Sequence, residues 1–192
     1  INELANLCEK LDVNIEDISI GMGLDKRIGG RFLRAGPAYG GSCFPKDTKA
    51  IANTADKFNT NLSIIKSVIK SNDKRSSLLL KRVFDILKGK IKNKKISFLG
   101  VTFKANTDDM RDSSCLTMIP SLIKKGALIN YFDPTGEKKE FKKINNITYS
   151  SDINSTIKDS DLIIIHTEWN DFKSINFKKV VQNKKFKIFD LR

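Results

Sequence analysis

Apolar side chains recur at helical spacing through the first part of the chain, up to about residue 88. Residues 1–11 carry such a stripe with no N-cap before it, so we expect the chain to start inside a helix. Asn14 can cap a second short helix. A third helix is expected next, capped by Asp47 or a near neighbour, and a longer fourth one over about 62–88, with Gly89 as its stop signal. This part of the chain is therefore predicted to be helical.

The apolar residues of these helices are expected to face a core. Cys8 lies on the first stripe and is interpreted as a core residue. In the third and fourth helices the residues expected to point inward are Ala50, Ile51, Ala55, Phe58, Ile65, Val68, Ile69, Leu79, Val83, Phe84 and Leu87.

The pattern changes at about residue 94, where short apolar segments begin to alternate with helical ones. The segments that predict strands are KKISFLG, ALINYFDP, DLIIIHTEW and FKIFDLR. The segments that predict helices are DSSCLTMIPSLIKKG, which Pro120 interrupts, TYSSDINSTIKDS and INFKKVVQN. This alternation favours right-handed βαβ units and a parallel sheet covered on both faces. We therefore predict an α/β protein, with a helical domain at residues 1–88 and a Rossmann-like parallel-sheet domain at residues 94–192.

A long glycine-rich segment, GMGLDKRIGGRFLRAGPAYGGSCFPKD, separates the second predicted helix from the third, and a loop of this length is usually functional. Its last residues hold Cys43, which precedes a helix N-terminus and has Lys46 nearby, two features that stabilise a thiolate. Gly40 and Gly41 let a substrate approach the backbone closely. Asp47 fits either a helix cap or a base that orients a water. The residues alone therefore leave two interpretations of Cys43 open, a nucleophile and a cysteine in an ordinary turn.

Ligands of open parallel sheets lie beyond the carboxyl ends of the strands. The turn after the first strand carries one glycine and no GxGxxG, so the dinucleotide fingerprint is absent. Asp133 fits a ribose-binding acid or an ordinary Asp-Pro turn equally well. His166 is the only histidine, and no nucleophile motif accompanies it, so we interpret it as structural. No pair of metal ligands stands at helical spacing, and no metal is predicted.

The formal net charge of +13 first suggests nucleic-acid binding. Residues 1–90 hold 16 basic and 10 acidic side chains, and residues 91–192 hold 19 and 12, so the excess is spread evenly. We interpret it as a lysine-rich solvated surface that binds no nucleic acid but attracts a phosphate-bearing small substrate. Three widely spaced cysteines and the absence of a membrane-length apolar run favour a cytoplasmic protein with reduced thiols and no membrane partner.

The segment GPAYGGSCFPKD, preceded by GMGLDKRIGGRFLRA and followed by FLGVTFKANTDDMRDS, resembles the UDP-glucose 6-dehydrogenase family over essentially the whole chain. The resemblance implies a twofold oxidation of UDP-glucose to UDP-glucuronate with NAD as the cofactor. In that family a cysteine attacks the C6 aldehyde formed by a first hydride transfer. The resulting thiohemiacetal is oxidised to a thioester, which water hydrolyses.

The resemblance also implies roles for individual residues. Cys43 matches the nucleophile, and Asp47 matches the residue that assists water and proton transfer. The matched cofactor contacts are Lys46 and Arg111, although a local ion pair of Arg111 with Asp108 or Asp112 is an alternative. The matched substrate contacts are Arg27, Phe32, Leu33, Arg34, Tyr39, Gly40, Phe103, Lys104 and Arg192. The arginine that matches Arg27 reaches into the neighbouring subunit, which implies a homodimer through the central helices.

One departure from the family concerns the amino-terminal NAD-binding domain with its GxGxxG and catalytic glutamate, for which the chain shows no counterpart. We therefore expect a carboxy-terminal piece of such an enzyme, which alone binds UDP-sugar weakly and does not turn over. A fragment of a GDP-mannose 6-dehydrogenase is an alternative, although Phe44 and the GMGLDKRIG stretch favour the UDP-glucose branch. The second alternative is a non-catalytic module that binds a nucleotide sugar and dimerises.

Overall fold

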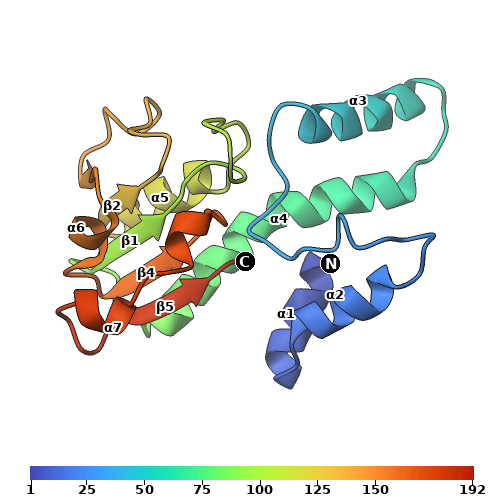
Figure 1. The fold of residues 1–192 in the computed structure, drawn as a ribbon. Coiled ribbons are helices and arrows are strands. Elements are labelled where there is room, and N and C mark those ends of the chain that lie inside the picture. Colours follow the sequence, from blue (N-terminus) through green and yellow to red (C-terminus); the bar gives the residue numbers. More distant parts are fainter.

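The computed structural model describes all 192 residues. Four helices come first along the chain: α1 (Asn2–Leu11), α2 (Ile15–Gly23), α3 (Phe44–Lys57) and α4 (Ser63–Ile86). Figure 1 shows α3 lying along the first half of α4, while the second half of α4 runs beside the sheet. The long helix α4 therefore belongs to both parts of the molecule.

The second part of the chain forms a five-stranded parallel sheet with the order β3-β2-β1-β4-β5. The strands are β1 (Lys95–Leu99), β2 (Leu128–Phe132), β3 (Ile147–Tyr149), β4 (Leu162–Ile165) and β5 (Lys187–Asp190). The helices between them are α5 (Cys115–Lys124), α6 (Ile153–Ile157) and α7 (Phe177–Val180), with a 3₁₀ turn η1 at Asn170–Phe172. The predicted α/β class and parallel sheet are confirmed. The strand order reverses between β1 and β4, where doubly wound sheets place their ligands.

The side chains of β1 alternate between the two faces of the sheet. Ile96 and Phe98 enter the larger core, which also takes in Leu79 and Val83 from α4 and apolar residues of α5. Leu99 enters the smaller core under α6, η1 and α7. Burial on both faces explains why the strands read as continuous apolar runs. The second half of α4 is therefore packed as one of the helices that cover the sheet.

Several helix boundaries differ from those expected. Cys43 is the N-cap of α3, so the helix begins before Asp47, which lies in the first turn and donates its N–H to the Cys43 carbonyl at 2.8 Å. At the end of α4 the first left-handed residue is Lys88, and Gly89 follows it with its N–H bonded to the Phe84 carbonyl at 2.8 Å. Pro120 lies inside α5 without interrupting it.

The helical part exposes much of the apolar surface that was expected to face a core. Phe58 is 77% exposed, Ile51 is 49% exposed and Val68 is 42% exposed. Ala50 is exposed as well, so the inward placement of these four residues is wrong for the single chain. Leu79 and Val83 are fully buried, as predicted. Cys8, which is 4% exposed, is also buried as predicted. No helix of the chain combines the length and the apolar character needed to cross a membrane.

Candidate functional site

The end of the glycine-rich loop, residues 40–43, packs against the loop that follows β1, residues 103–112. The N–H of Gly41 donates to the Arg111 carbonyl at 2.8 Å. A Cβ on Gly40 would lie 2.7 Å from the Asp112 carbonyl oxygen, and one on Gly41 would lie 2.7 Å from the Phe103 ring. Gly41 also has a φ of +85°, which disfavours any other residue. The two glycines are therefore required for the contact that joins the two loops.

Cys43 is exposed at the start of α3, and its Sγ lies 3.5 Å from the Ser42 hydroxyl. Lys46 pairs with Asp47 at 3.1 Å, and both side chains are mostly exposed. The hydrogen bond and charge of Asp47 raise the pKa of Lys46, with a smaller contribution from Cys43. Asp109 raises the pKa of Arg111, again with a smaller contribution from Cys43. The thiol thus has two cations and a helix N-terminus around it, an environment typical of reactive cysteines.

Arg111 forms a local ion pair, but its partner is Asp109 and neither Asp108 nor Asp112. Its Nε and Nη2 donate to the Asp109 carboxylate at 2.9 and 2.8 Å. The main-chain N–H of Arg111 donates to the same carboxylate at 2.9 Å, so the turn itself selects this acid. The Arg111 side chain is still 67% exposed and remains available to a ligand beside Cys43.

Arg192 joins three segments at the carboxyl ends of the strands. Its Nε donates to the His166 carbonyl at 3.0 Å and its Nη2 donates to the Phe103 carbonyl at 3.3 Å. A Cβ on Gly36 would lie 2.8 Å from its Nη1, so the glycine-rich loop also packs on this guanidinium. Burial lowers the pKa of Arg192.

Two further matched residues lie around Arg192. Arg34 reaches Glu168 at 3.7 Å, and the Lys104 ammonium lies 5.4 Å from the centre of the Phe103 ring. Together with Arg192 they place three cations and an aromatic ring beside the carboxyl ends of β1 and β4, where the strand order reverses. This composition suits the phosphates and the base of a nucleotide.

Three further matched residues, Arg27, Phe32 and Leu33, lie earlier in the glycine-rich loop. Arg27 is bound to Asp25 at 2.6 Å, and its side chain is 89% exposed. Phe32 is 85% exposed and lies under the guanidinium of Arg31. The Leu33 carbonyl accepts a hydrogen bond from Ser19. The structure therefore brings Gly40, Phe103 and Arg111 to the thiol, and leaves Arg27 and Phe32 on the outside.

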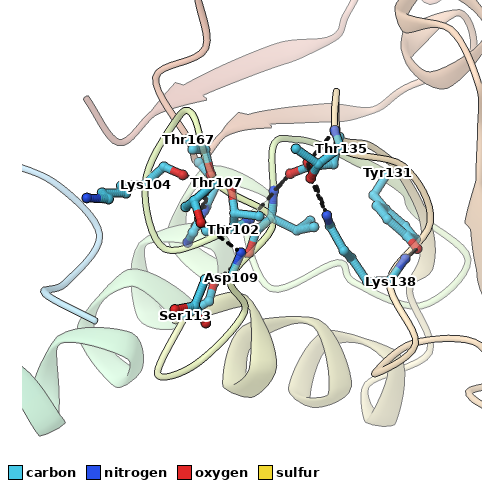
Figure 2. Close-up of polar contacts among 12 residues, drawn as sticks. Thr102, Lys104, Thr107, Asp109, Ser113, Tyr131, Thr135, Lys138 and Thr167 are labelled. Atoms are coloured by element: carbon cyan, nitrogen blue, oxygen red, sulfur yellow. Dashed lines mark hydrogen bonds and ion pairs between the residues drawn. The ribbon is translucent and has the colours of Figure 1, made fainter. Parts of the chain in front are cut away.

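Asp133 is fully buried and holds the turn that leads from β1 to Phe103. Figure 2 shows Lys138 and Thr135, which are bound to each other beside this turn. Its carboxylate accepts from the N–H of Val101 at 2.9 Å and from the N–H of Thr135 at 3.0 Å. The buried ammonium of Lys138 lies 3.4 Å from the same carboxylate and also bonds the Thr135 hydroxyl. Because these groups occupy both oxygens, Asp133 acts as a structural turn residue and not as a ribose-binding acid.

His166 is fully buried, as expected of a structural histidine. Its Nε2 lies 2.7 Å from the Ser114 hydroxyl and its Nδ1 lies 3.0 Å from the Thr167 hydroxyl. Burial lowers the pKa of His166 to about 3, with a smaller contribution from the charge of Arg192. The imidazole is therefore neutral at physiological pH. It connects the end of β4 to the residues just before α5.

The free energy of unfolding is expected to fall as the pH falls from about 6.5 to about 3, because the unfolded chain takes up a proton at His166 that the folded chain excludes. One such proton corresponds to about 1.4 kcal/mol per pH unit. Urea denaturation at several pH values measures this slope. In His166→Gln, which cannot be charged, the slope between pH 6 and 4 should be shallower by that amount. Equal slopes in the two proteins would show that His166 is already protonated in the fold.

Two residues of α4 that the sequence analysis did not identify bind the main chain of the glycine-rich loop. Asn72 makes two hydrogen bonds to Tyr39, and Arg75 makes two to the Gly36 carbonyl. Asn72 and Tyr39 also line a cleft of about 230 Å³ between α4 and the start of α5. No group of three or more His, Cys, Asp or Glu side chains that could hold a metal ion occurs in the chain.

Two family models match the chain. The model of the UDP binding domain of the UDP-glucose/GDP-mannose dehydrogenase family matches residues 97–192, and the model of the central domain of the same family matches residues 1–74. The UDP-glucose 6-dehydrogenases of Rickettsia felis and Rhizobium meliloti are 43% and 40% identical to the chain. Both alignments cover all of this chain and 44% of the relative, so the chain spans less than half the length of these curated relatives.

Solved structures of nucleotide-sugar dehydrogenases have the same fold. The UDP-glucose dehydrogenase of Pyrobaculum islandicum matches the whole chain with a TM-score of 0.88 and 29% identity, over 43% of its own length. The GDP-mannose dehydrogenase of Pseudomonas aeruginosa matches 99% of the chain with a TM-score of 0.66 and 25% identity, over 45% of its own length.

Proposed function

The chain belongs to the UDP-glucose/GDP-mannose dehydrogenase family, and we propose that it forms the thiol-bearing and UDP-binding part of an NAD-dependent UDP-glucose 6-dehydrogenase. The observation that carries the proposal is the contact between the Cys43 loop and the loop after β1. This contact places an exposed thiol at a helix N-terminus beside the cations and the ring expected to bind the nucleotide.

Cys43 acts in this proposal on the C6 aldehyde of the sugar. Its thiolate adds to the carbonyl carbon, a carbon–sulfur bond forms, and the carbonyl electron pair moves to the oxygen, giving a thiohemiacetal. The N–H groups at the start of α3 and the ammonium of Lys46 stabilise the negative charge on that oxygen. Loss of a hydride from the adduct leaves a thioester, and attack by water releases the acid and regenerates the thiol. Asp47, in the first turn of α3, accepts the proton of that water.

NAD⁺, when bound, supplies the acceptor for the two hydrides. The residues of this chain fit the edge of such a cofactor, since Lys46 and Arg111 are exposed cations beside the thiol. They do not fit a complete dinucleotide cradle. A Cβ on Gly100 would lie 2.5 Å from the Thr167 side chain, so Thr167 already fills the space behind the β1 turn. In this proposal Lys46 and Arg111 contact a cofactor that is held elsewhere.

The UDP group is assigned to the carboxyl ends of β1, β4 and β5. Phe103 offers a ring face to the uracil, while Lys104, Arg34 and Arg192 offer positive charge to the diphosphate. Tyr39 stacks edge-on against Phe44 with ring centres 4.7 Å apart, which orders the loop next to the sugar. The positive charge of the chain favours the approach of such an anion.

A homodimer through the central helices is part of the same proposal. The apolar side chains that remain exposed on the helical part include Leu24, Phe58 and Ile64, each between 77% and 79% exposed. In this proposal a second copy of the chain covers these side chains. The family resemblance implies that Arg27, whose side chain is 89% exposed in this chain, reaches into the partner's site.

Calorimetry of the 192-residue chain with UDP-glucose and with GDP-mannose tests the nucleotide assignment. UDP-glucose is expected to bind with a dissociation constant in the range of about 0.1–1 mM, roughly 4–5.5 kcal/mol, and GDP-mannose at least tenfold more weakly. Lys104→Ala should weaken UDP-glucose binding about tenfold. Tighter binding of GDP-mannose would assign the chain to the GDP-mannose branch of the family.

The chain alone, mixed with UDP-glucose and NAD⁺, is expected to produce no NADH.

A further inference from the structure

We propose that Asn72 and Arg75, one turn apart on α4, are positioning residues for the Cys43 loop. They bind the main chain of this loop at Tyr39 and Gly36. The inference depends on the proposed function only for its catalytic consequence, because the geometry can be tested without turnover.

Asn72 satisfies both main-chain groups of one residue. Its Oδ1 accepts the N–H of Tyr39 at 2.9 Å, and its Nδ2 donates to the Tyr39 carbonyl at 3.0 Å. Only a side-chain amide offers a donor and an acceptor at this spacing. A carboxylate keeps the first hydrogen bond and sets an anion against the carbonyl in place of the second. The side-chain amide therefore fixes the position and the orientation of this peptide.

Arg75 holds the same loop three residues earlier. Its Nε and Nη2 donate to the Gly36 carbonyl at 3.2 and 3.0 Å, and its Nη1 donates to the Asn6 side chain at 2.6 Å. Arg75 is 5% exposed, which is rare for an arginine that has no carboxylate bound to it. Burial lowers the pKa of Arg75 to about 10, so the side chain stays charged at neutral pH. A buried charge whose hydrogen bonds go mainly to one loop carbonyl and to α1 fixes that loop against two helices.

The positions fixed by α4 determine where the thiol lies. The Tyr39 ring rests edge-on against Phe44, the residue after Cys43. Two residues beyond Tyr39, the N–H of Gly41 reaches the Arg111 carbonyl. The segment from 36 to 44 is thus held by α4 at one end and by the loop after β1 at the other. The same helix packs with its second half into the core of the sheet, so α4 sets the distance between the thiol and the UDP site.

Hydrogen exchange followed by NMR on the 192-residue chain tests the inference. In Asn72→Ala the Gly41 amide, which does not touch Asn72, should exchange about tenfold faster, the change expected when a part-buried pair of hydrogen bonds is lost. The amides of residues 96–99 in β1 should keep their rates. Asn72→Asp, which retains the acceptor but sets an anion against the Tyr39 carbonyl, should also accelerate exchange at Gly41. Arg75→Lys, which keeps the charge but loses the fork, should also accelerate Gly41.

Ser71→Ala is the matched control, because Ser71 donates from the same helix to Glu3 of α1 at 2.8 Å and does not touch the loop. Unchanged exchange at Gly41 in both Asn72 variants overturns the inference. Equal acceleration of Gly41 and the β1 amides also overturns it, since the two residues would then support only general stability. If Asn72→Ala does not fold, Asn72→Asp decides on the same criterion. Suppose that the unsubstituted chain, fused to the amino-terminal part of the Rickettsia felis relative, oxidises no UDP-glucose, while Gly41 still exchanges faster in Asn72→Ala. The positioning role would then stand, and the result would count against the proposed function alone.

Discussion

Replacing Cys43 by alanine is expected to limit the yield of NADH to at most one per UDP-glucose and to slow its production by about 10³-fold or more. The assay requires a fusion of the amino-terminal part of the Rickettsia felis relative to this chain, because the chain spans 44% of that relative. The unsubstituted fusion should yield two NADH per UDP-glucose. Without the thiol no thiohemiacetal forms, so the reaction stops at the aldehyde.

Cys8→Ala provides the control for this experiment. Cys8 is buried on α1, so its loss removes a sulfur from the core without changing the site. This variant should keep a yield of two NADH and a rate within a few-fold of the fusion. A Cys43→Ala fusion that still yields two NADH at an undiminished rate would show that Cys43 is a turn residue. The chain would then fit the non-catalytic module that was the alternative from the sequence.

Replacing Asp133 by alanine is expected to lower the free energy of unfolding by about 3–5 kcal/mol, the range observed when one partner of a buried pair is removed. Lys138, which is 5% exposed, would lose its counter-charge, and the N–H of Val101 would lose its acceptor at the end of β1. Urea denaturation monitored by circular dichroism measures the loss. The turn that carries Phe103 should loosen as well, so UDP-glucose binding should weaken in the same variant.

Two further variants test whether the unpaired charge of Lys138 causes the loss of stability in Asp133→Ala. Glu137, the residue before Lys138, forms an exposed ion pair with Lys142. Glu137→Ala removes this pair and should lower the free energy of unfolding by no more than about 1 kcal/mol. Asp133→Ala combined with Lys138→Met removes both charges and should recover part of the stability that Asp133→Ala loses. A double variant less stable than Asp133→Ala would show that Lys138 contributes through hydrogen bonds and packing and not through an unpaired charge.

The sequence predicted the parallel sheet because its central strands are buried on both faces and therefore appear as apolar runs. It missed β3, which has three residues, none fully buried, at the edge of the sheet. The cap at Asn14 was predictable because its side chain bonds Glu16 two residues away. The partner of Arg111 was not, because three acids lie within three residues of it and only the turn geometry selects Asp109.

The candidate site was predictable in composition but not in arrangement. The motif around Cys43 identified the chemistry, yet the hydrogen bond from Gly41 to Arg111 joins residues 70 positions apart in the sequence. The same holds for Asn72 and Tyr39, whose side-chain and main-chain pairing spans 33 positions. Asp133 stayed ambiguous because its role depends on Lys138, whose burial no local pattern indicates. Contacts of this kind form only in the tertiary structure, so no local pattern in the sequence indicates them.

The close packing of Gly40 and Gly41 on Phe103 and Asp112 has a consequence for protein engineering. The two loops are complementary in shape, so neither can be exchanged alone for the corresponding loop of another family member. A graft of residues 103–112 from a GDP-specific relative should be accepted only together with its own residues 40–43. Natural sequences should likewise keep glycine at position 41 wherever a large side chain stands at position 103.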